Sequence, residues 1–179
     1  TVRTEFISKR EVEEAAKVAR SLGIDHWIID LHLKDLVMSN PPNRCYICKR
    51  QIMASLKKIA SKTGFDTVVD GTNFDDLGLD RPGLEALKEE GIRSPLAELR
   101  IGKAQIRKLS KALGLNYTKP ANPCLATRFP FGHKITTNDL ELVDAAEEFI
   151  RKMGFKVVRV RVSDSTAKIE VGRKERLRL

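Results

Sequence analysis

Helical and extended hydrophobic patterns alternate along the first half of the chain, and this alternation constrains the fold more than any single motif. Ser8 and Glu11 form a capping-box pattern at the start of an amphipathic helix. A short apolar strand follows at residues 26–30. A second helix ends before Gly64 and leads into a strand at residues 67–70. Such alternation is typical of parallel sheets with helices on both faces, so the sequence predicts an α/β protein with a doubly wound parallel sheet.

The pattern changes near residue 137. A helix with apolar residues on one face precedes two segments of alternating apolar and polar residues, at 157–162 and 167–171, which a short polar turn joins. Such a pair is typical of an antiparallel hairpin with one face on a core. We therefore expect a larger domain over residues 1–133 and a small, partial α+β domain over residues 134–179.

Charge and hydrophobicity limit the classes of protein to consider. The 179 residues are 41% hydrophobic, enough to form a core, and carry a net charge of +9. This charge favours anionic partners such as nucleotides, phosphorylated metabolites or RNA, although basic residues on helix surfaces explain it equally well. No apolar run approaches the roughly 20 residues that span a bilayer, and no signal peptide is visible. We expect a cytoplasmic protein without membrane contact.

Two of the three cysteines, Cys45 and Cys48, stand in R-C-Y-I-C-K at the start of the second helix. Residues spaced i, i+3 share one face of a helix, so both sulfurs should project from its first turn. The helix N-terminus and the cations Arg44, Lys49 and Arg50 favour the thiolate form. A C-x-x-C pair serves zinc ribbons, redox pairs and iron–sulfur clusters, and the pattern alone leaves all three open.

The third cysteine, Cys124, lies in K-P-A-N-P-C-L-A-T-R, within a long proline-punctuated stretch typical of functional loops. If the fold brings Cys124 to Cys45 and Cys48, the three thiolates would leave one coordination position open, as in a metal or cluster site that does chemistry. A zinc site would need a fourth ligand, for which His133 is the candidate. The alternatives are a redox pair with Cys124 incidental, or a buried structural cysteine. An odd number of cysteines argues against a disulfide framework.

A polar loop, D-G-T-N-F-D-D, follows the strand at residues 67–70 directly. It should lie at the carboxyl edge of the sheet, where α/β proteins bind ligands. Its carboxylates could hold the Mg²⁺ of a nucleotide, or the loop could be an Asx-rich turn. The nucleotide-binding candidates are Asp70, Gly71, Thr72, Asn73, Asp75, Asp76 and the nearby cation Arg81.

Arginines form a second group of candidates. Arg159 and Arg161 alternate along a strand and therefore share a face, where two guanidinium groups suit a phosphate. Glu170 on the neighbouring strand could instead pair with one of them across the hairpin. Arg128 brings positive charge to the Cys124 thiol. The substrate-binding candidates are Arg128, Arg159, Arg161 and Glu170.

The motifs together resemble the LarE family, the ATP-dependent sulfur transferases that help to build the nickel-pincer nucleotide cofactor of lactate racemase. The resemblance rests on P-P-N-R-C-Y-I-C-K, D-G-T-N-F-D-D, R-P-G, R-S-P-L-A-E, K-P-A-N-P-C-L-A-T-R-F-P-F-G and R-V-R-V…K-I-E-V. It covers nearly the whole chain. It implies the adenine nucleotide α-hydrolase-like fold of the PP-loop superfamily.

The resemblance also implies a reaction. ATP and Mg²⁺ would adenylylate a carboxylate of a nicotinate-derived pyridinium dicarboxylate mononucleotide, and sulfur would displace AMP. In one branch of the family, the cysteine that Cys124 matches gives up its sulfur and becomes dehydroalanine. In the other branch, three cysteines hold a 4Fe-4S cluster whose open iron binds hydrosulfide, and the pair Cys45 and Cys48 is similar to this branch. The three cysteines are thus the catalytic candidates.

The resemblance further implies a homo-oligomer, transient contacts with lactate racemase maturation partners, and a role for Arg159, Arg161 and Glu170 at the substrate phosphate and subunit interface. One family motif, the S-G-G-x-D-S pyrophosphate loop, is absent from the sequence, and the last elements of the C-terminal domain are also lacking. We therefore expect these residues alone not to adenylylate substrate; ATP pyrophosphatase activity from them would contradict this expectation.

Two other functions compete with this interpretation. A tRNA thiolase of the same superfamily would also use ATP and three cysteines, and the net charge of +9 favours it. No dedicated RNA-binding module is visible in the sequence, so we expect nucleic acid not to be the partner. The other candidate is a zinc-stabilised binding domain without catalysis.

Overall fold

The computed structural model describes residues 1–78 and 81–178, which form two compact units. Unit 1 consists of Thr1–Pro41 together with Pro120–Leu179, and unit 2 of Pro42–Lys119. Unit 2 therefore lies, in the sequence, between the two segments of unit 1. Helices and small sheets confirm the predicted α/β class. The predicted domain boundary between residues 133 and 134 stays a prediction.

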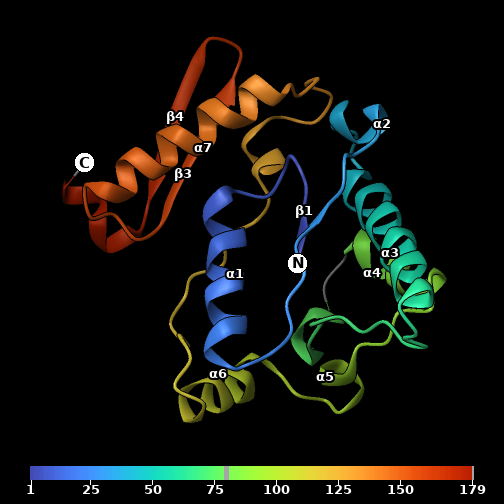
Figure 1. Cartoon of the computed structure of the whole chain (residues 1–179). Coiled ribbons are helices and arrows are strands. Elements are labelled where there is room, and N and C mark those ends of the chain that lie inside the picture. The colour runs from blue at the N-terminus through green and yellow to red at the C-terminus, as the bar shows by residue number, and fades with distance from the viewer. Residues whose placement is uncertain (79–80, 179) are drawn as a thin grey trace. The chain divides into compact units, whose positions relative to one another are not determined.

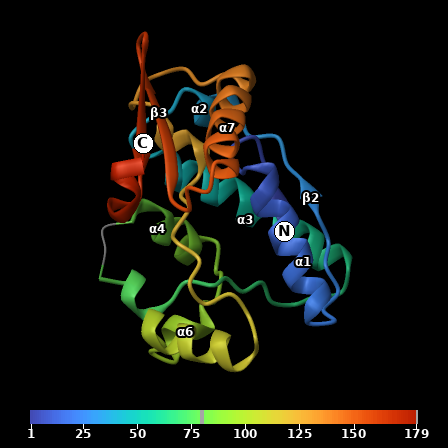
Figure 2. The ribbon, with the colours of Figure 1, turned by 90° about the vertical axis from the view of Figure 1, so that its left-hand side faces the viewer.

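The first segment of unit 1 contains a short parallel sheet and a capped helix. Strand β1 (Val2–Arg3) pairs in parallel with β2 (Ile29–Asp30). Helix α1 (Lys9–Ser21) connects them, and Figure 2 shows the chain running on from α1 into β2. The Ser8 side chain accepts a hydrogen bond from the backbone N–H of Glu11, which confirms the predicted cap. A short helix, α2 (Asp35–Met38), ends this segment.

The second segment of unit 1 contains the predicted helix and hairpin. The short 3-10 helix η2 (Leu125–Arg128) precedes α7 (Thr137–Lys152), the antiparallel strands β3 (Val158–Ser163) and β4 (Thr166–Val171), and η3 (Arg173–Arg178). Helix α7 lies along the hairpin (Figure 1). Their shared core consists of Ile150, Phe155, Val158 and Val160. The sequence prediction of a helix and an antiparallel hairpin here is confirmed.

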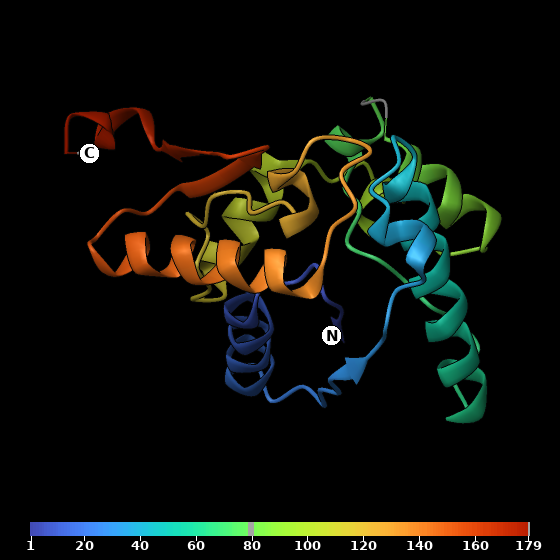
Figure 3. The same cartoon turned by 90° about the horizontal axis from the view of Figure 1, so that it is seen from above.

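Unit 2 is mainly helical. Its elements are α3 (Arg44–Lys62), the 3-10 helix η1 (Phe74–Asp76), α4 (Pro82–Glu89), α5 (Pro95–Glu98) and α6 (Lys103–Ala112). Figure 3 shows α3 as one continuous helix, which ends before Gly64 as predicted. Helices α3 and α4 pack against each other. Met53 of α3, Leu87 of α4 and Ile92, which follows α4, form the core of this unit.

The segment at residues 67–70 does not form the predicted buried strand. It makes one isolated parallel bridge, between Val69 and Arg93, and the Val69 side chain is 56% exposed. Extended structure is weak here because, among the described residues of unit 2, no second strand pairs with the opposite edge. The described residues contain two two-stranded sheets and this bridge, so they do not show a doubly wound sheet. No helix in the described ranges combines the length and apolar character needed to cross a membrane.

Candidate functional site

The cysteine pair lies at the start of α3, as predicted. Helix α3 begins at Arg44, so Cys45 and Cys48 are its second and fifth residues and lie on one face of its N-terminal end. Cys45 is exposed and Cys48 is partly buried. Lys49, the next residue, places its Nζ atom 3.7 Å from Oδ2 of Asp70. This ion pair connects the cysteine helix to the polar loop of the same unit.

The loop over residues 70–76, called the acidic loop below, begins with a well-satisfied carboxylate. Asp70 accepts hydrogen bonds from the backbone N–H of Thr72 (3.1 Å), from Thr72 Oγ1 (2.6 Å) and from Ser94 Oγ (2.6 Å). Burial by itself would raise the Asp70 pKa, but the hydrogen bonds from Ser94 and Thr72 outweigh it and lower the pKa. Asp70 is therefore held as an anion.

The acidic loop ends in a capping box. The Asn73 side chain accepts from the Asp75 N–H, and Asp76 accepts from the Asn73 N–H and side-chain amide. Arg81 Nη1 lies 3.0 Å and Lys103 Nζ 3.2 Å from Asp76 Oδ1. Burial would raise the Asp76 pKa, but the Asn73 backbone hydrogen bond, Lys103 and Arg81 together lower it.

The remaining carboxylate of the acidic loop also has a partner inside unit 2. Asp75 Oδ2 accepts from the Lys103 backbone N–H at 2.7 Å. A Cβ at Gly102 would lie 2.8 Å from Asp75 Oδ1, so a larger residue at this position would require the Asp75 side chain to shift. The geometry matches the Asx-rich-turn alternative, with two cations at its rim. Ser94 and Lys103 were not among the predicted site residues, because their contacts are made across the fold. The predicted nucleotide contacts of the loop, including Gly71, stay predictions.

Cys124 lies in unit 1 on a loop with fixed backbone contacts. It is the residue directly before η2, and its carbonyl accepts from the Thr127 N–H (3.0 Å) and from Thr127 Oγ1 (2.8 Å). The next residue, Leu125, donates its N–H to the Phe6 carbonyl at 2.9 Å. Cys124 is partly buried and lines a hollow of about 270 Å³, together with Phe6, Ser8 and other residues of the unit. The thiol therefore belongs to an ordered loop beside an open space.

Arg128, in the same loop, is buried and fully engaged. Its Nε donates to Glu147 Oε1 at 2.6 Å and its Nη2 to Glu147 Oε2 at 3.1 Å. The side chains of Arg128 and Glu147 are 0% and 1% exposed. Glu147 also accepts from Arg151 Nη2 (2.7 Å) and from the Val160 N–H (2.9 Å). Burial would raise the Glu147 pKa, but the Arg128, Val160 and Arg151 hydrogen bonds lower it below its ordinary value.

Glu147 was not among the predicted site residues. Its position carried a signal, because it falls among Val143 and Ile150 on the buried face of α7. A glutamate within an apolar helical stripe needs a buried partner. The identity of that partner, Arg128, could not be read from spacing.

The arginine pair on β3 shows the cross-strand pairing that the sequence left open. Arg161 Nε lies 2.9 Å from Glu170 Oε2, and Arg161 Nη1 donates to the Thr127 carbonyl at 2.8 Å. Arg159 lies directly opposite Glu170 in the register. The hydrogen bond from Arg161 lowers the pKa of Glu170, and the charge of Arg159 adds to the effect. A role of these residues at a substrate phosphate stays a prediction.

The predicted three-thiolate site would combine residues of both units, because Cys45 and Cys48 belong to unit 2 and Cys124 to unit 1. Among the described residues, neither unit by itself groups three His, Cys, Asp or Glu side chains for a metal ion. His133, the candidate fourth zinc ligand, stacks on Phe129 with ring centroids 5.2 Å apart. The described residues contain no disulfide between the cysteines.

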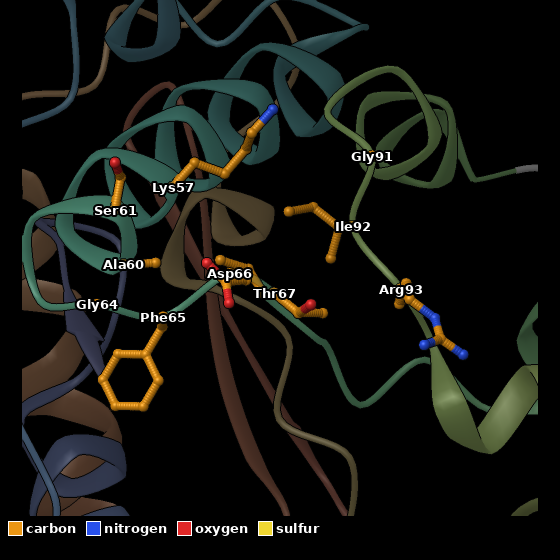
Figure 4. A pocket seen from close by; sticks show the side chains of 11 residues that line it. Lys57, Ala60, Ser61, Gly64, Phe65, Asp66, Thr67, Gly91, Ile92 and Arg93 are labelled. Atoms are coloured by element: carbon orange, nitrogen blue, oxygen red, sulfur yellow. The ribbon is translucent and has the colours of Figure 1, made fainter.

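A hollow in unit 2 was not predicted. It measures about 430 Å³ and lies between the C-terminal end of α3 and residues 91–93 (Figure 4). Its two cations are already paired, Lys57 with Glu90 at 3.5 Å and Arg93 with Glu98 at 2.6 Å. None of the predicted site residues lines it.

Comparison with known proteins gives three similar chains, although no protein-family model matches. One is an uncharacterised protein of Synechocystis, 43% identical over 90% of this chain and 61% of its own length. Another is an uncharacterised protein of Methanocaldococcus jannaschii, 38% identical over 95% of this chain and 66% of its own length. The third is the pyridinium-3,5-bisthiocarboxylic acid mononucleotide synthase of Lactiplantibacillus plantarum, 34% identical over 94% of this chain and 62% of its own length.

These relatives agree in one respect. The chain spans less than two thirds of the length of each. The relative with a named activity is an enzyme that, by its name, makes a bisthiocarboxylic acid mononucleotide. The similarity to it extends over nearly the whole of this chain.

Proposed function

We propose that the protein inserts sulfur into a carboxylate of a pyridinium dicarboxylate mononucleotide, as a step in nickel-pincer cofactor biosynthesis. The observation that carries the proposal is the 34% identity to the Lactiplantibacillus plantarum synthase over 94% of this chain. The ordered loop that presents Cys124 to a hollow of about 270 Å³ supports it, because a sulfur donor needs both fixed position and access. The fold would be that of the PP-loop superfamily, in a cytoplasmic homo-oligomer that meets lactate racemase maturation partners.

The proposed reaction begins with ATP and Mg²⁺. A substrate carboxylate oxygen attacks the α-phosphate, pyrophosphate leaves, and the resulting acyl adenylate is open to a sulfur nucleophile. The Cys124 thiolate would displace AMP to form a thioester. Loss of the Cys124 α-proton and cleavage of its Cβ–S bond would release the thiocarboxylate and leave dehydroalanine. The protein's task in this step is to hold Cys124 in line with the adenylate.

A second source of sulfur is consistent with the cysteine pair. Cys45 and Cys48 lie on one face of a helix N-terminus, which fits two ligand positions of a 4Fe-4S cluster, and Cys124 would be the third ligand. When bound, such a cluster supplies an open iron that binds hydrosulfide for repeated transfer. The choice between the two sources determines whether the enzyme turns over once or many times.

The test uses the complete gene product, purified without oxygen and assayed for iron and zinc. It is incubated with ATP, Mg²⁺ and pyridinium dicarboxylate mononucleotide, with and without sulfide, and products are read by mass spectrometry. We expect the oxygen-to-sulfur mass change in the nucleotide, and its loss in Cys124→Ser. Dehydroalanine at position 124 after one turnover indicates the sacrificial branch. Iron and sulfide-dependent turnover that Cys45→Ser removes indicate the cluster branch.

Other outcomes would overturn the proposal. Thiolation of tRNA without thiolation of the mononucleotide would establish the RNA thiolase instead. Stoichiometric zinc without iron, together with no reaction on either substrate, would establish a binding domain.

A further inference from the structure

The Cys124 loop has almost no secondary structure of its own. Between Pro120 and Thr136, the only regular element is the four-residue η2. Such a loop keeps one conformation only if contacts from outside it offset the conformational entropy that its ordering costs. Residues of α7 and β3 make such contacts with the Cys124 loop.

Arg128 has no N–H group left for a ligand. An arginine side chain offers five N–H donors. Two point at Glu147, and the others donate to the Pro123 carbonyl (3.3 Å), to Thr127 Oγ1 (2.8 Å) and to Asn122 Oδ1 (3.3 Å). Three of these acceptors belong to residues on either side of Cys124. The guanidinium therefore binds the loop itself.

Glu147 makes this arrangement stable. A guanidinium at 0% exposure is costly unless a counter-charge and hydrogen bonds compensate it. The Glu147 carboxylate provides both, and its contacts with Arg151 and the Val160 N–H anchor it to α7 and β3. The loop is thereby connected to the rigid helix and hairpin of unit 1.

Thr127 connects Arg128 to the cysteine. Its hydroxyl accepts from Arg128 and donates to the Cys124 carbonyl at 2.8 Å. Its own carbonyl accepts from Arg161 at 2.8 Å. A continuous chain of hydrogen bonds thus runs from Glu147 through Arg128 and Thr127 to the backbone of Cys124.

We propose that Glu147, Arg128 and Thr127 form a positioning clamp that fixes the Cys124 thiol for sulfur transfer, with Arg128 binding the loop rather than the substrate. The catalytic consequence of the clamp rests on the proposed function. Its structural consequence, a restrained thiol, is independent of that function. Arg161 belongs to the clamp as the donor to Thr127.

The test compares Thr127→Val with Thr127→Ser in the complete gene product. Valine keeps the shape but removes the hydroxyl, whereas serine keeps the hydroxyl. Alkylation of each cysteine by iodoacetamide in metal-free protein is followed by peptide mass spectrometry, with Cys45 in unit 2 as the internal reference. We expect Thr127→Val to change the Cys124 alkylation rate relative to Cys45 by about tenfold, because it removes the two part-buried hydrogen bonds of the Thr127 hydroxyl. Thr127→Ser should leave the rate unchanged.

The second readout is how each substitution changes kcat and KM of the sulfur-transfer reaction. A positioning residue should lower kcat while leaving KM for the mononucleotide within about twofold, because it does not contact substrate. Arg128→Lys keeps the charge but cannot reproduce the fork of donors, so it should lower kcat in this way. A raised KM with unchanged kcat and unchanged alkylation would show that Arg128 binds substrate, and would overturn the clamp.

The two proposals fail in distinguishable ways. If the wild-type protein thiolates no mononucleotide but Thr127→Val still alters Cys124 alkylation, the clamp stands and the proposed function falls. If thiolation occurs and Cys124 alkylation is the same in Thr127→Val as in the wild type, the clamp is overturned while the function stands. The test uses Thr127→Val because this variant still decides it if substitution of the buried Glu147 prevents folding.

Discussion

The Cys124 loop and the acidic loop carry the two sets of candidate site residues, and they are held in different ways. The Cys124 loop depends on a buried ion pair between residues far apart in sequence, Arg128 and Glu147. The acidic loop combines contacts between near neighbours, such as Asp70 with Thr72, with part-buried or exposed hydrogen bonds from Ser94 and Lys103 across the fold. Half-exposed cations lie at its rim. The tertiary fold holds both loops, but it holds the Cys124 loop through a fully buried charge pair and the acidic loop through hydrogen bonds and partly exposed ion pairs.

The largest effect is expected from a substitution that breaks the buried ion pair between Arg128 and Glu147. Glu147→Gln leaves the Arg128 guanidinium buried without a counter-charge, so we expect the free energy of unfolding to fall by about 3–5 kcal/mol. Urea unfolding measures it. The control is Glu148→Gln, one residue further along α7 and partly exposed, for which we expect a change within about 0.5 kcal/mol. Equal effects of the two substitutions would contradict the buried network.

A smaller effect is expected at the acidic loop. Asn73→Ala removes the cap of η1 and should lower the free energy of unfolding by about 1 kcal/mol. The exposed Asn138, which makes no cap, is the matched position, and Asn138→Ala should change the value by less than about 0.5 kcal/mol. If Asn73→Ala lowered the free energy of unfolding as much as Glu147→Gln, the two loops would not differ in how strongly they are held.

Two carboxylates one turn apart on α7, Glu147 and Asp144, should affect stability in opposite ways as the pH falls. The pKa of Glu147 is lowered in the folded state, so its stabilisation is present above the ordinary glutamate pKa of 4.5 and is lost as pH falls through the folded value. Burial raises the pKa of Asp144, so its ionised form opposes folding and protonation relieves this as pH falls. Urea midpoints measured from neutral to acid pH should fall less steeply in Glu147→Gln and more steeply in Asp144→Asn.

The smallest expected effect is at the rim of the acidic loop. Lys103 is 54% exposed, so its ion pair with Asp76 is screened, and Lys103→Ala should change the free energy of unfolding by less than about 1 kcal/mol. The difference should shrink further at high salt. A thermal melt at low and high salt checks this, and a salt-independent loss would show that Lys103 does more than pair at the surface.

Local signals in the sequence predicted much of this structure. The Ser8 cap, the placement of Cys45 and Cys48 at the start of a helix, and the hairpin at β3 and β4 were all predicted and are confirmed. Each depends on residues within a few positions of one another, whose spacing determines geometry directly. The prediction of a buried strand at residues 67–70 was wrong. Strand formation depends on a partner strand, which the residues of the segment themselves do not specify.

The sequence by itself determined which residues could do chemistry: three cysteines, a loop of carboxylates and a pair of arginines on one strand face. Only the tertiary structure decided how they are used within each unit. It engaged Arg128 with Glu147, connected Arg161 to both Glu170 and the Cys124 loop, and brought Ser94 and Lys103 to the acidic loop. The physical reason is that a buried charge needs its partner in space, whereas sequence spacing constrains only neighbours along the chain.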